Sequence, residues 1–134
     1  MILDHLGIAV RSLDEALRFY RDSLGLHASA TEEIPGEGVR IAFLPVGESR
    51  LELLEPLSHD SSIAKFLDKK GEGIHHVCLA VTDLEAALAS VELRGAQIIS
   101  PRVRTGAGGR RVAFIHPRSA GGVLLELVER PRRS

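Results

Sequence analysis

The sequence predicts an α+β fold in which one domain contains two βαβββ modules, and two observations support this prediction. Residues 5–17 recur in similar form at 76–88, and residues 51–55 recur at 125–129. In both copies, a segment of alternating apolar residues, typical of a strand, precedes apolar residues at helical spacing. A chain of 134 residues is long enough to bury the core of such a domain without disulfides.

The first copy begins with an alternating segment from Ile2 to Val10, which predicts a strand. Ser12 and Glu15 have the spacing of a capping box, so they predict the start of a helix, and Gly25 is suited to end it. Three further strands are expected at about 26–34, 38–46 and 49–55, separated by glycine-containing turns. The first copy therefore has the predicted order βαβββ.

The second copy repeats this order. A strand is predicted from Ile74 to Val81, and a second capping box from Thr82 to Glu85 begins a helix that ends at Gly95. Strands are expected near 96–100, 110–116 and 122–129. The expected boundaries are about 1–56 for module one, 57–72 for the connector, which contains a short helix at Ser61–Leu67, 73–130 for module two, and 130–134 for a tail.

The composition argues against several classes of function. The formal net charge is -1, so the chain has no basic excess with which to neutralise the phosphates of a nucleic acid. Cys78 is the single cysteine, which excludes an internal disulfide. No segment approaches the roughly 20 apolar residues of a membrane span, and the N-terminal segment does not resemble a secretion signal. We expect a cytoplasmic protein that binds neither nucleic acid nor membrane.

Two histidines and two glutamates occur at matching positions of the two copies. His5 matches His76, and Glu52 matches Glu126. A single strand histidine is more often structural than functional, and a glutamate between leucines often faces solvent. The recurrence of both residue types makes coincidence less plausible. If a pseudo-twofold axis relates the copies, all four side chains converge near that axis.

Two imidazoles and two carboxylates suit a divalent transition metal such as Co²⁺, Mn²⁺, Zn²⁺, Ni²⁺ or Fe²⁺. Four protein ligands on an octahedral ion leave two positions for water or substrate. An open coordination position is what distinguishes a catalytic metal site from a structural one. The four residues therefore predict a metal-dependent enzyme.

At these residues the chain resembles the vicinal-oxygen-chelate, or glyoxalase-like, superfamily. The resemblance implies that the two βαβββ modules form a cupped, barrel-like wall around one metal, with ligands on the first and last strands of each module. Within the superfamily, the chain is similar to the methylmalonyl-CoA epimerases over almost its whole length. The similar segments are 4–10, 52–57, 62–67, 73–76, 114–119 and 121–127.

This resemblance implies an isomerase that interconverts (R)- and (S)-methylmalonyl-CoA by moving the C2 proton through an enolate. It implies that His5, Glu52, His76 and Glu126 bind one divalent metal, with Co²⁺ the first expectation and Mn²⁺, Ni²⁺ or Zn²⁺ the alternatives. It also implies that Glu126 transfers a proton, and we suggest Glu52 for the second proton transfer. Some epimerases carry another glutamate where this chain has residues 40–43, which include no carboxylate, so the second base remains open.

Cationic residues are expected to contact the acyl-CoA. Arg104 and Arg118, with His116, are the candidates for substrate binding near the glycine-rich segment 105–109. The alternative is an ordinary glycine hairpin with solvated arginines. Short modules leave open sheet edges that often pair between subunits, so a homodimer is expected.

Two other functions are compatible with the same residues. One is a lactoylglutathione lyase of the glyoxalase I type, which uses similar metal chemistry on a glutathione adduct. The other is a metal-free module of the same fold that binds a small molecule. Metal analysis and turnover of each substrate would separate the three.

Overall fold

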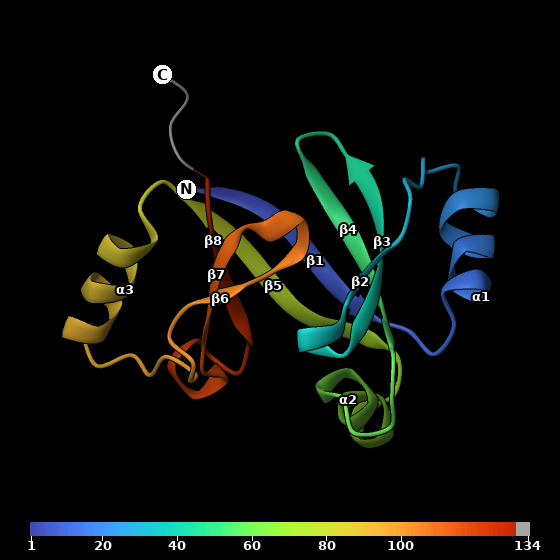
Figure 1. Ribbon diagram of the computed structural model, residues 1–134. Helices are drawn as coiled ribbons and strands as arrows, with labels where there is room; N and C mark the ends of the chain where they lie inside the picture. Colours follow the sequence, from blue (N-terminus) through green and yellow to red (C-terminus); the bar gives the residue numbers. More distant parts are fainter. Residues whose placement is uncertain (131–134) are drawn as a thin grey trace. The chain divides into compact units, whose positions relative to one another are not determined.

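The computed structural model describes residues 1–130, and in each copy of the repeat one helix, α1 or α3, lies to one side of the strands (Figure 1). The chain divides into two compact units. One unit is His5–His75, and the other joins Met1–Asp4 to the chain from His76 onward. The predicted α+β fold class with two βαβββ modules is confirmed.

In the unit His5–His75, which includes β1 from His5 onward, the strands follow the order β2–β3–β4–β1. The strands are β1 Ile2–Ala9, β2 Glu32–Ile34, β3 Val39–Val46 and β4 Ser49–Pro56. Strands β2, β3 and β4 are antiparallel neighbours, whereas β1 runs parallel to β4. Strand β2 is shorter than predicted because Leu26 and Ala28 pack against the core below the helix instead of joining the sheet.

Helix α1 (Leu13–Leu17) begins where the capping box predicted, because the Ser12 hydroxyl accepts the N–H of Glu15. The segment continues as a π-helical turn, η1 (Arg18–Ser23), before Gly25 turns the chain at a φ of +89°. The predicted connector helix is α2 (Ser62–Lys70), capped by Ser61, and a 3-10 turn, η2 (Pro35–Glu37), precedes β3.

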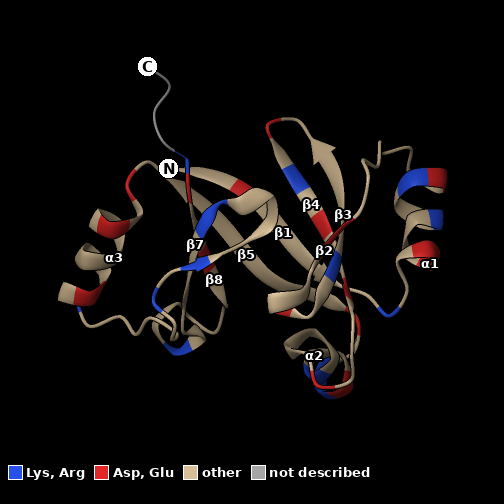
Figure 2. Ribbon diagram, in the orientation of Figure 1, with Lys and Arg blue, Asp and Glu red and all other residues tan. Residues whose placement is uncertain are grey.

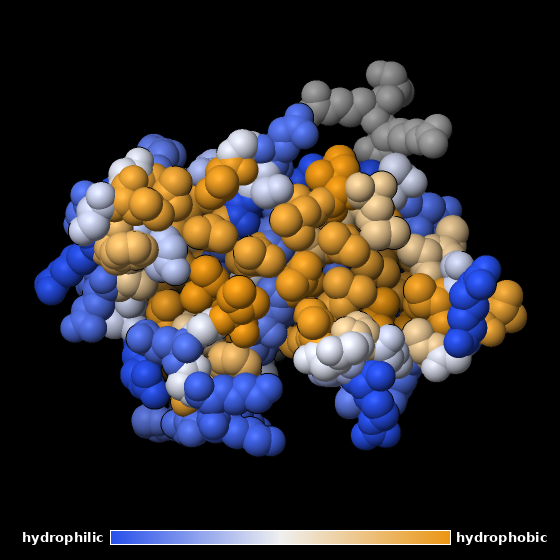
Figure 3. Space-filling model, turned by 180° about the vertical axis from the view of Figure 1, so that it is seen from behind, coloured by the Kyte–Doolittle hydropathy of each residue, from blue (hydrophilic) through white to orange (hydrophobic). Residues whose placement is uncertain are grey.

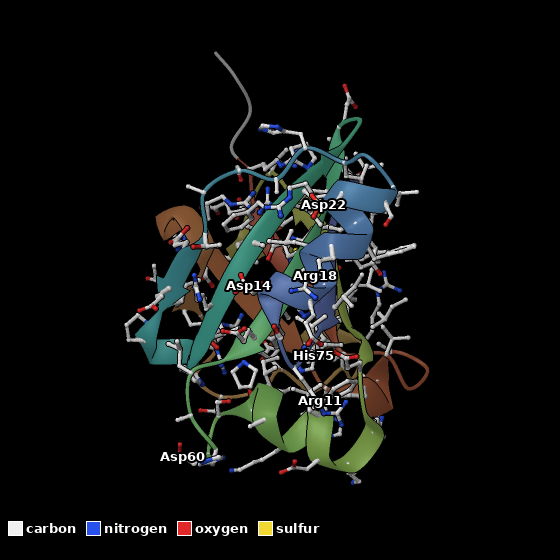
Figure 4. All side chains as sticks on the ribbon, turned by 90° about the vertical axis from the view of Figure 1, so that its right-hand side faces the viewer. Arg11, Asp14, Arg18, Asp22, Asp60 and His75 are labelled. Atoms are coloured by element: carbon white, nitrogen blue, oxygen red, sulfur yellow. The ribbon has the colours of Figure 1, made fainter. Side chains whose placement is uncertain are left out.

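Asp14, Arg18 and Asp22 follow one another along α1 and η1 (Figure 4), and a hydrogen bond from Arg21 lowers the pKa of Asp22.

Helix α1 covers one face of this sheet. Leu13 and Leu17 are buried against Leu51 and Leu53 of β4, together with Leu44 of β3. Each fully buried leucine contributes about 1.5–3 kcal/mol to stability. Since neighbouring residues of a strand point to opposite faces, packing of these leucines turns the intervening glutamate away from α1.

The second unit contains the sheet β5–β8–β7–β6. Its strands are β5 Gly73–Val81, β6 Arg104–Thr105, β7 Arg111–Ile115 and β8 Leu125–Glu129, and its helices are α3 Leu84–Leu93, η3 Ala107–Gly109 and η4 Pro117–Ser119. Strand β8 is parallel to β5 and antiparallel to β7, so the pattern of the first unit recurs. Leu84 and Leu88 of α3 pack against Ile115 and Leu127.

Three details of the second copy differ from the prediction. The prediction of a strand at 96–100 was wrong. This segment forms only an isolated β-bridge, which joins Ile98 to Ile115. The helix cap is Asp83 rather than Thr82, because the Asp83 carboxylate accepts the N–H of Ala86. Arg130 does not begin a tail: its N–H donates to the Val81 carbonyl at 2.7 Å. The remaining tail residues, 131–134, lie outside the described residues.

A glutamate at the end of the last strand caps the helix in both units. Glu55 Oε2 accepts the N–H of Leu13 at 2.8 Å, and Glu129 Oε2 accepts the N–H of Leu84 at 3.0 Å. A carboxylate at a helix N-terminus satisfies an otherwise unpaired N–H and interacts favourably with the helix dipole. These two glutamates therefore have a structural role that explains their recurrence in the repeat.

Charged residues of both signs occur on α1 and α2 (Figure 2). This distribution agrees with the near-neutral formal charge of the sequence. Among the described residues, none of the helices has both the length and the apolar character needed to cross a bilayer.

Candidate active site

Six polar or charged residues are buried among residues 1–130. They are Asp4, His5, Glu52, Ser61, His76 and Glu126. Four of these six are the residues that the sequence analysis selected as metal ligands. Burial of an ionisable group costs free energy unless the group is paired, so each of these positions requires a polar partner.

The first predicted pair comes together in the unit His5–His75. Because β1 runs parallel to β4 with Gly7 beside Glu52, the His5 and Glu52 side chains share the sheet face opposite α1. His5 Nδ1 lies 3.2 Å from Glu52 Oε2. Both residues are only 3% exposed.

The second predicted pair comes together in the other unit in the same way. Here Cys78 lies beside Glu126, and His76 Nε2 is 3.1 Å from Glu126 Oε1. The exposed fractions are 6% for His76 and 7% for Glu126. Each half of the repeat thus buries one imidazole against one carboxylate.

The donor atoms of the second pair have a spacing that suits a shared cation. Two ligand atoms bound at right angles, each about 2.1 Å from an ion, lie about 3 Å apart. The nitrogen–oxygen separation of 3.1 Å between His76 and Glu126 matches this value, whereas Glu52 Oε2 of the first pair is also contacted by Arg50. The donor set, with imidazole nitrogen and carboxylate oxygen, is also one that divalent transition metals accept.

A phenylalanine and an arginine accompany the glutamate in each unit. Phe43 pairs across the hairpin with Glu52, and the Arg50 guanidinium lies 5.3 Å from the centre of its ring. In the second unit, Phe114 pairs with Glu126, and the Arg104 guanidinium lies 5.2 Å from the Phe114 ring. Both arrangements have the geometry of a cation–π contact.

Arg50 also contacts the predicted site directly, which the sequence analysis missed. Its Nε and Nη2 atoms lie 2.8 Å and 2.6 Å from Glu52 Oε2. The spacing of two residues between Arg50 and Glu52 could have indicated this contact, because residues i and i+2 of a strand share a face.

The predicted substrate-binding residues lie in the second unit, with Arg104 on β6, His116 at the start of η4 and Arg118 within η4. Arg104 is partly buried, and its Nη2 donates to the carbonyl of Ser100 at 3.0 Å. Arg118 is exposed in η4. His116 Nδ1 accepts the N–H of Arg118 at 3.0 Å, so this nitrogen stabilises the turn that holds both residues.

The other arginines near the glycine-rich segment are paired with carboxylates. Arg110 donates through Nη1 and Nη2 to the buried Asp4 at 3.0 Å and 3.1 Å. Arg111 Nη2 donates to Glu85 at 3.1 Å, and Arg102 forms an ion pair with Glu92 that raises the pKa of Arg102. These three side chains therefore have structural partners, in agreement with the alternative that the loop is a hairpin carrying ordinary surface arginines.

Comparison with known proteins now identifies the family. The family model of the Glyoxalase/Bleomycin resistance protein/Dioxygenase superfamily matches residues 4–114. The chain belongs to this superfamily. Membership confirms the resemblance inferred from the repeat and from the segments around the histidines and glutamates.

Within the Glyoxalase/Bleomycin resistance protein/Dioxygenase superfamily, the chain is similar to epimerases. It is 41% identical over 126 residues to the mitochondrial methylmalonyl-CoA epimerase of Homo sapiens, covering 93% of this chain and 72% of the relative. The methylmalonyl-CoA epimerase of Mycobacterium tuberculosis has 42% identity and a TM-score of 0.90, covering 98% of this chain and 88% of that one. A variant of the Streptomyces coelicolor epimerase, solved in complex with 2-nitronate-propionyl-CoA, has 39% identity and a TM-score of 0.90, covering 95% and 92%.

Proposed function

We propose that this protein is an epimerase that interconverts (R)- and (S)-methylmalonyl-CoA. The observation that carries the proposal is the pair of buried His–Glu contacts at matching positions of the repeat, in a chain about 40% identical to methylmalonyl-CoA epimerases. The C2 hydrogen of this substrate lies between a carboxylate and a thioester, which makes it acidic. An enzyme needs only to stabilise the resulting enolate and to return the proton to the opposite face.

His5, Glu52, His76 and Glu126 together would hold one divalent metal ion, with Co²⁺ the first expectation and Mn²⁺, Ni²⁺ or Zn²⁺ the alternatives. When bound, such an ion acts as a Lewis acid that stabilises negative charge on the oxygens of the substrate. The spacing of the His76 and Glu126 donor atoms and the burial of all four residues support this assignment.

Glu126 is proposed to transfer the C2 proton on one face of the substrate. Glu52, its counterpart in the repeat, is proposed for the second proton transfer. Burial among apolar side chains such as Val128 and Phe114 excludes bulk water from the neighbourhood of Glu126, which favours transfer to the substrate rather than to solvent.

Arg104, Arg118 and His116 are proposed to contact the acyl-CoA. Guanidinium groups bind carboxylates and phosphates through paired N–H donors, and methylmalonyl-CoA carries both kinds of group. The exposure of Arg118 and the fixed orientation of Arg104 over Phe114 are compatible with such contacts.

The proposal is tested by an epimerase assay before and after treatment with a chelator, followed by addition of Co²⁺. Loss of activity and its recovery are expected. Activity that persists in metal-free protein would exclude the metal-dependent mechanism. A protein that epimerises nothing and binds no metal would instead support the small-molecule-binding alternative.

The lactoylglutathione lyase alternative has weaker support. The lactoylglutathione lyase of Haemophilus influenzae is 27% identical to this chain, compared with 41% for the human epimerase. Turnover of methylmalonyl-CoA and of the glutathione hemithioacetal, measured on the same preparation, separates the two activities.

We also propose a cytoplasmic homodimer in which residues 1–134 act as a single domain. Large apolar side chains are exposed in both units, and Figure 3 shows apolar residues across the face that it displays. Exposed apolar area of this kind is typical of a surface that a partner covers. Sedimentation or light scattering would test the dimer.

A further inference from the structure

Three nitrogen atoms converge on a single oxygen of Glu52. Arg50 Nε lies 2.8 Å and Nη2 lies 2.6 Å from Oε2, and His5 Nδ1 lies 3.2 Å from the same atom. Two N–H donors engage both lone pairs of a carboxylate oxygen. Oε2 of Glu52 is therefore fully engaged by contacts within the unit.

Arg50 is itself held in a defined orientation. Its guanidinium lies over the ring of Phe43 at 5.3 Å, while its N–H groups contact Glu52. A planar guanidinium that stacks on one group and donates to another has few alternative rotamers. Phe43, Arg50 and Glu52 thus form a rigid set of side chains on the β3–β4 hairpin.

We propose that Arg50 is a positioning residue for Glu52. Its hydrogen bonds occupy Oε2, so that Oε1 is the oxygen through which Glu52 acts. This inference rests on the proposed function, because it concerns how Glu52 meets the divalent ion. Glu52 then binds the ion through one oxygen only. As a consequence, the two roles proposed for Glu52, metal ligand and proton-transfer group, compete for Oε1.

The competing explanation is that Arg50 and Glu52 form an ion pair that contributes only to folding. The variant Arg50→Lys separates the explanations, because lysine keeps the charge but lacks the planar pair of donors. Arg40→Lys is the matched control. Arg40 lies on β3 of the same sheet and reaches Glu55 at 3.8 Å, at the capped end of α1 rather than at Glu52.

The experiment measures the dissociation constant of Co²⁺ by competition with a chromophoric chelator, together with the visible spectrum of the Co²⁺-loaded protein. We expect Arg50→Lys to weaken Co²⁺ binding by about 10–100-fold, the usual effect of losing a residue that orients a metal ligand. Its spectrum should also change, since the position of the Glu52 oxygen alters the ligand field. Arg40→Lys should leave both quantities unchanged.

The variant Phe43→Leu gives a second test if Arg50→Lys folds poorly. It removes the ring beneath the guanidinium and should weaken Co²⁺ binding in the same direction, by a smaller factor. Unchanged affinity and spectrum in both variants, with Glu52→Ala still losing Co²⁺, would overturn the positioning role of Arg50. If the unaltered protein binds no Co²⁺, the proposed function fails as well.

Discussion

The His5–Glu52 and His76–Glu126 pairs occupy matching positions of the repeat, yet their surroundings differ. His5 approaches its glutamate through Nδ1, whereas His76 uses Nε2. Arg50 hydrogen-bonds the carboxylate of the first pair. The repeat therefore places an imidazole against a carboxylate in each unit, while the atoms through which they meet differ.

The comparison extends to the residue before each histidine. Asp4 is fully buried and accepts hydrogen bonds from Arg110 and Arg130. Its counterpart His75 packs edge-on against Phe66 of α2, with ring centres 5.0 Å apart. The residue before His5 thus belongs to a charged cluster, whereas the residue before His76 makes an aromatic contact.

The largest expected effect is a loss of epimerase turnover when Glu126 is replaced. Glu126→Gln should lower the epimerase kcat by about 10²–10⁴-fold, because glutamine cannot accept the C2 proton. Exchange of the C2 hydrogen with deuterium from the solvent, measured in the metal-loaded variant, reports this step directly. A variant that retains metal and exchanges at the normal rate would remove Glu126 from proton transfer.

A smaller effect is expected for Arg104, which is proposed to bind the substrate. Arg104→Ala should raise the KM for methylmalonyl-CoA by about 10–100-fold, the value of a lost hydrogen bond to a charged group. Arg111→Ala is the control, since Arg111 pairs with Glu85. Equal KM values for the two variants would contradict a specific role of Arg104.

The charged cluster should be needed for stability. Asp4→Asn leaves Arg110 and Arg130 without their carboxylate, and we expect the free energy of unfolding to fall by about 1–3 kcal/mol. This estimate is below that for a fully buried pair because both arginines are partly exposed. Urea denaturation measures the change, with the exposed Asp14→Asn as control. An unaltered midpoint for Asp4→Asn would show that the cluster contributes nothing.

The smallest effect concerns a feature that the two units share, the glutamate that caps the helix. Glu55→Gln and Glu129→Gln each weaken one carboxylate cap of a helix, and each should lower the free energy of unfolding by about 0.5–2 kcal/mol. The two losses should be similar, because the capping distances are 2.8 Å and 3.0 Å. A loss in one unit only would show that the second cap is not equivalent to the first.

Sequence reasoning predicted those parts of the molecule that depend on local pattern. The alternation of residues along β4 and β8 correctly predicted that Glu52 and Glu126 point away from the helices. In the structure, the flanking leucines pack on α1 and α3. The contacts of Arg110 with Asp4 could not be predicted, because these residues are far apart in sequence and depend on the fold. The segment 96–100 was predicted as a strand because its apolar content does not reveal that it forms only an isolated bridge to β7.

Strand β1 has a further consequence for how the protein could be divided. Its first three residues, Ile2–Asp4, group with the half of the chain that follows His75, while its remaining residues pair with β4. A recombinant fragment that starts at His76 would lack Asp4, leaving two guanidinium groups without their common acceptor. A cut at the repeat boundary would therefore separate Asp4 from both arginines with which it pairs.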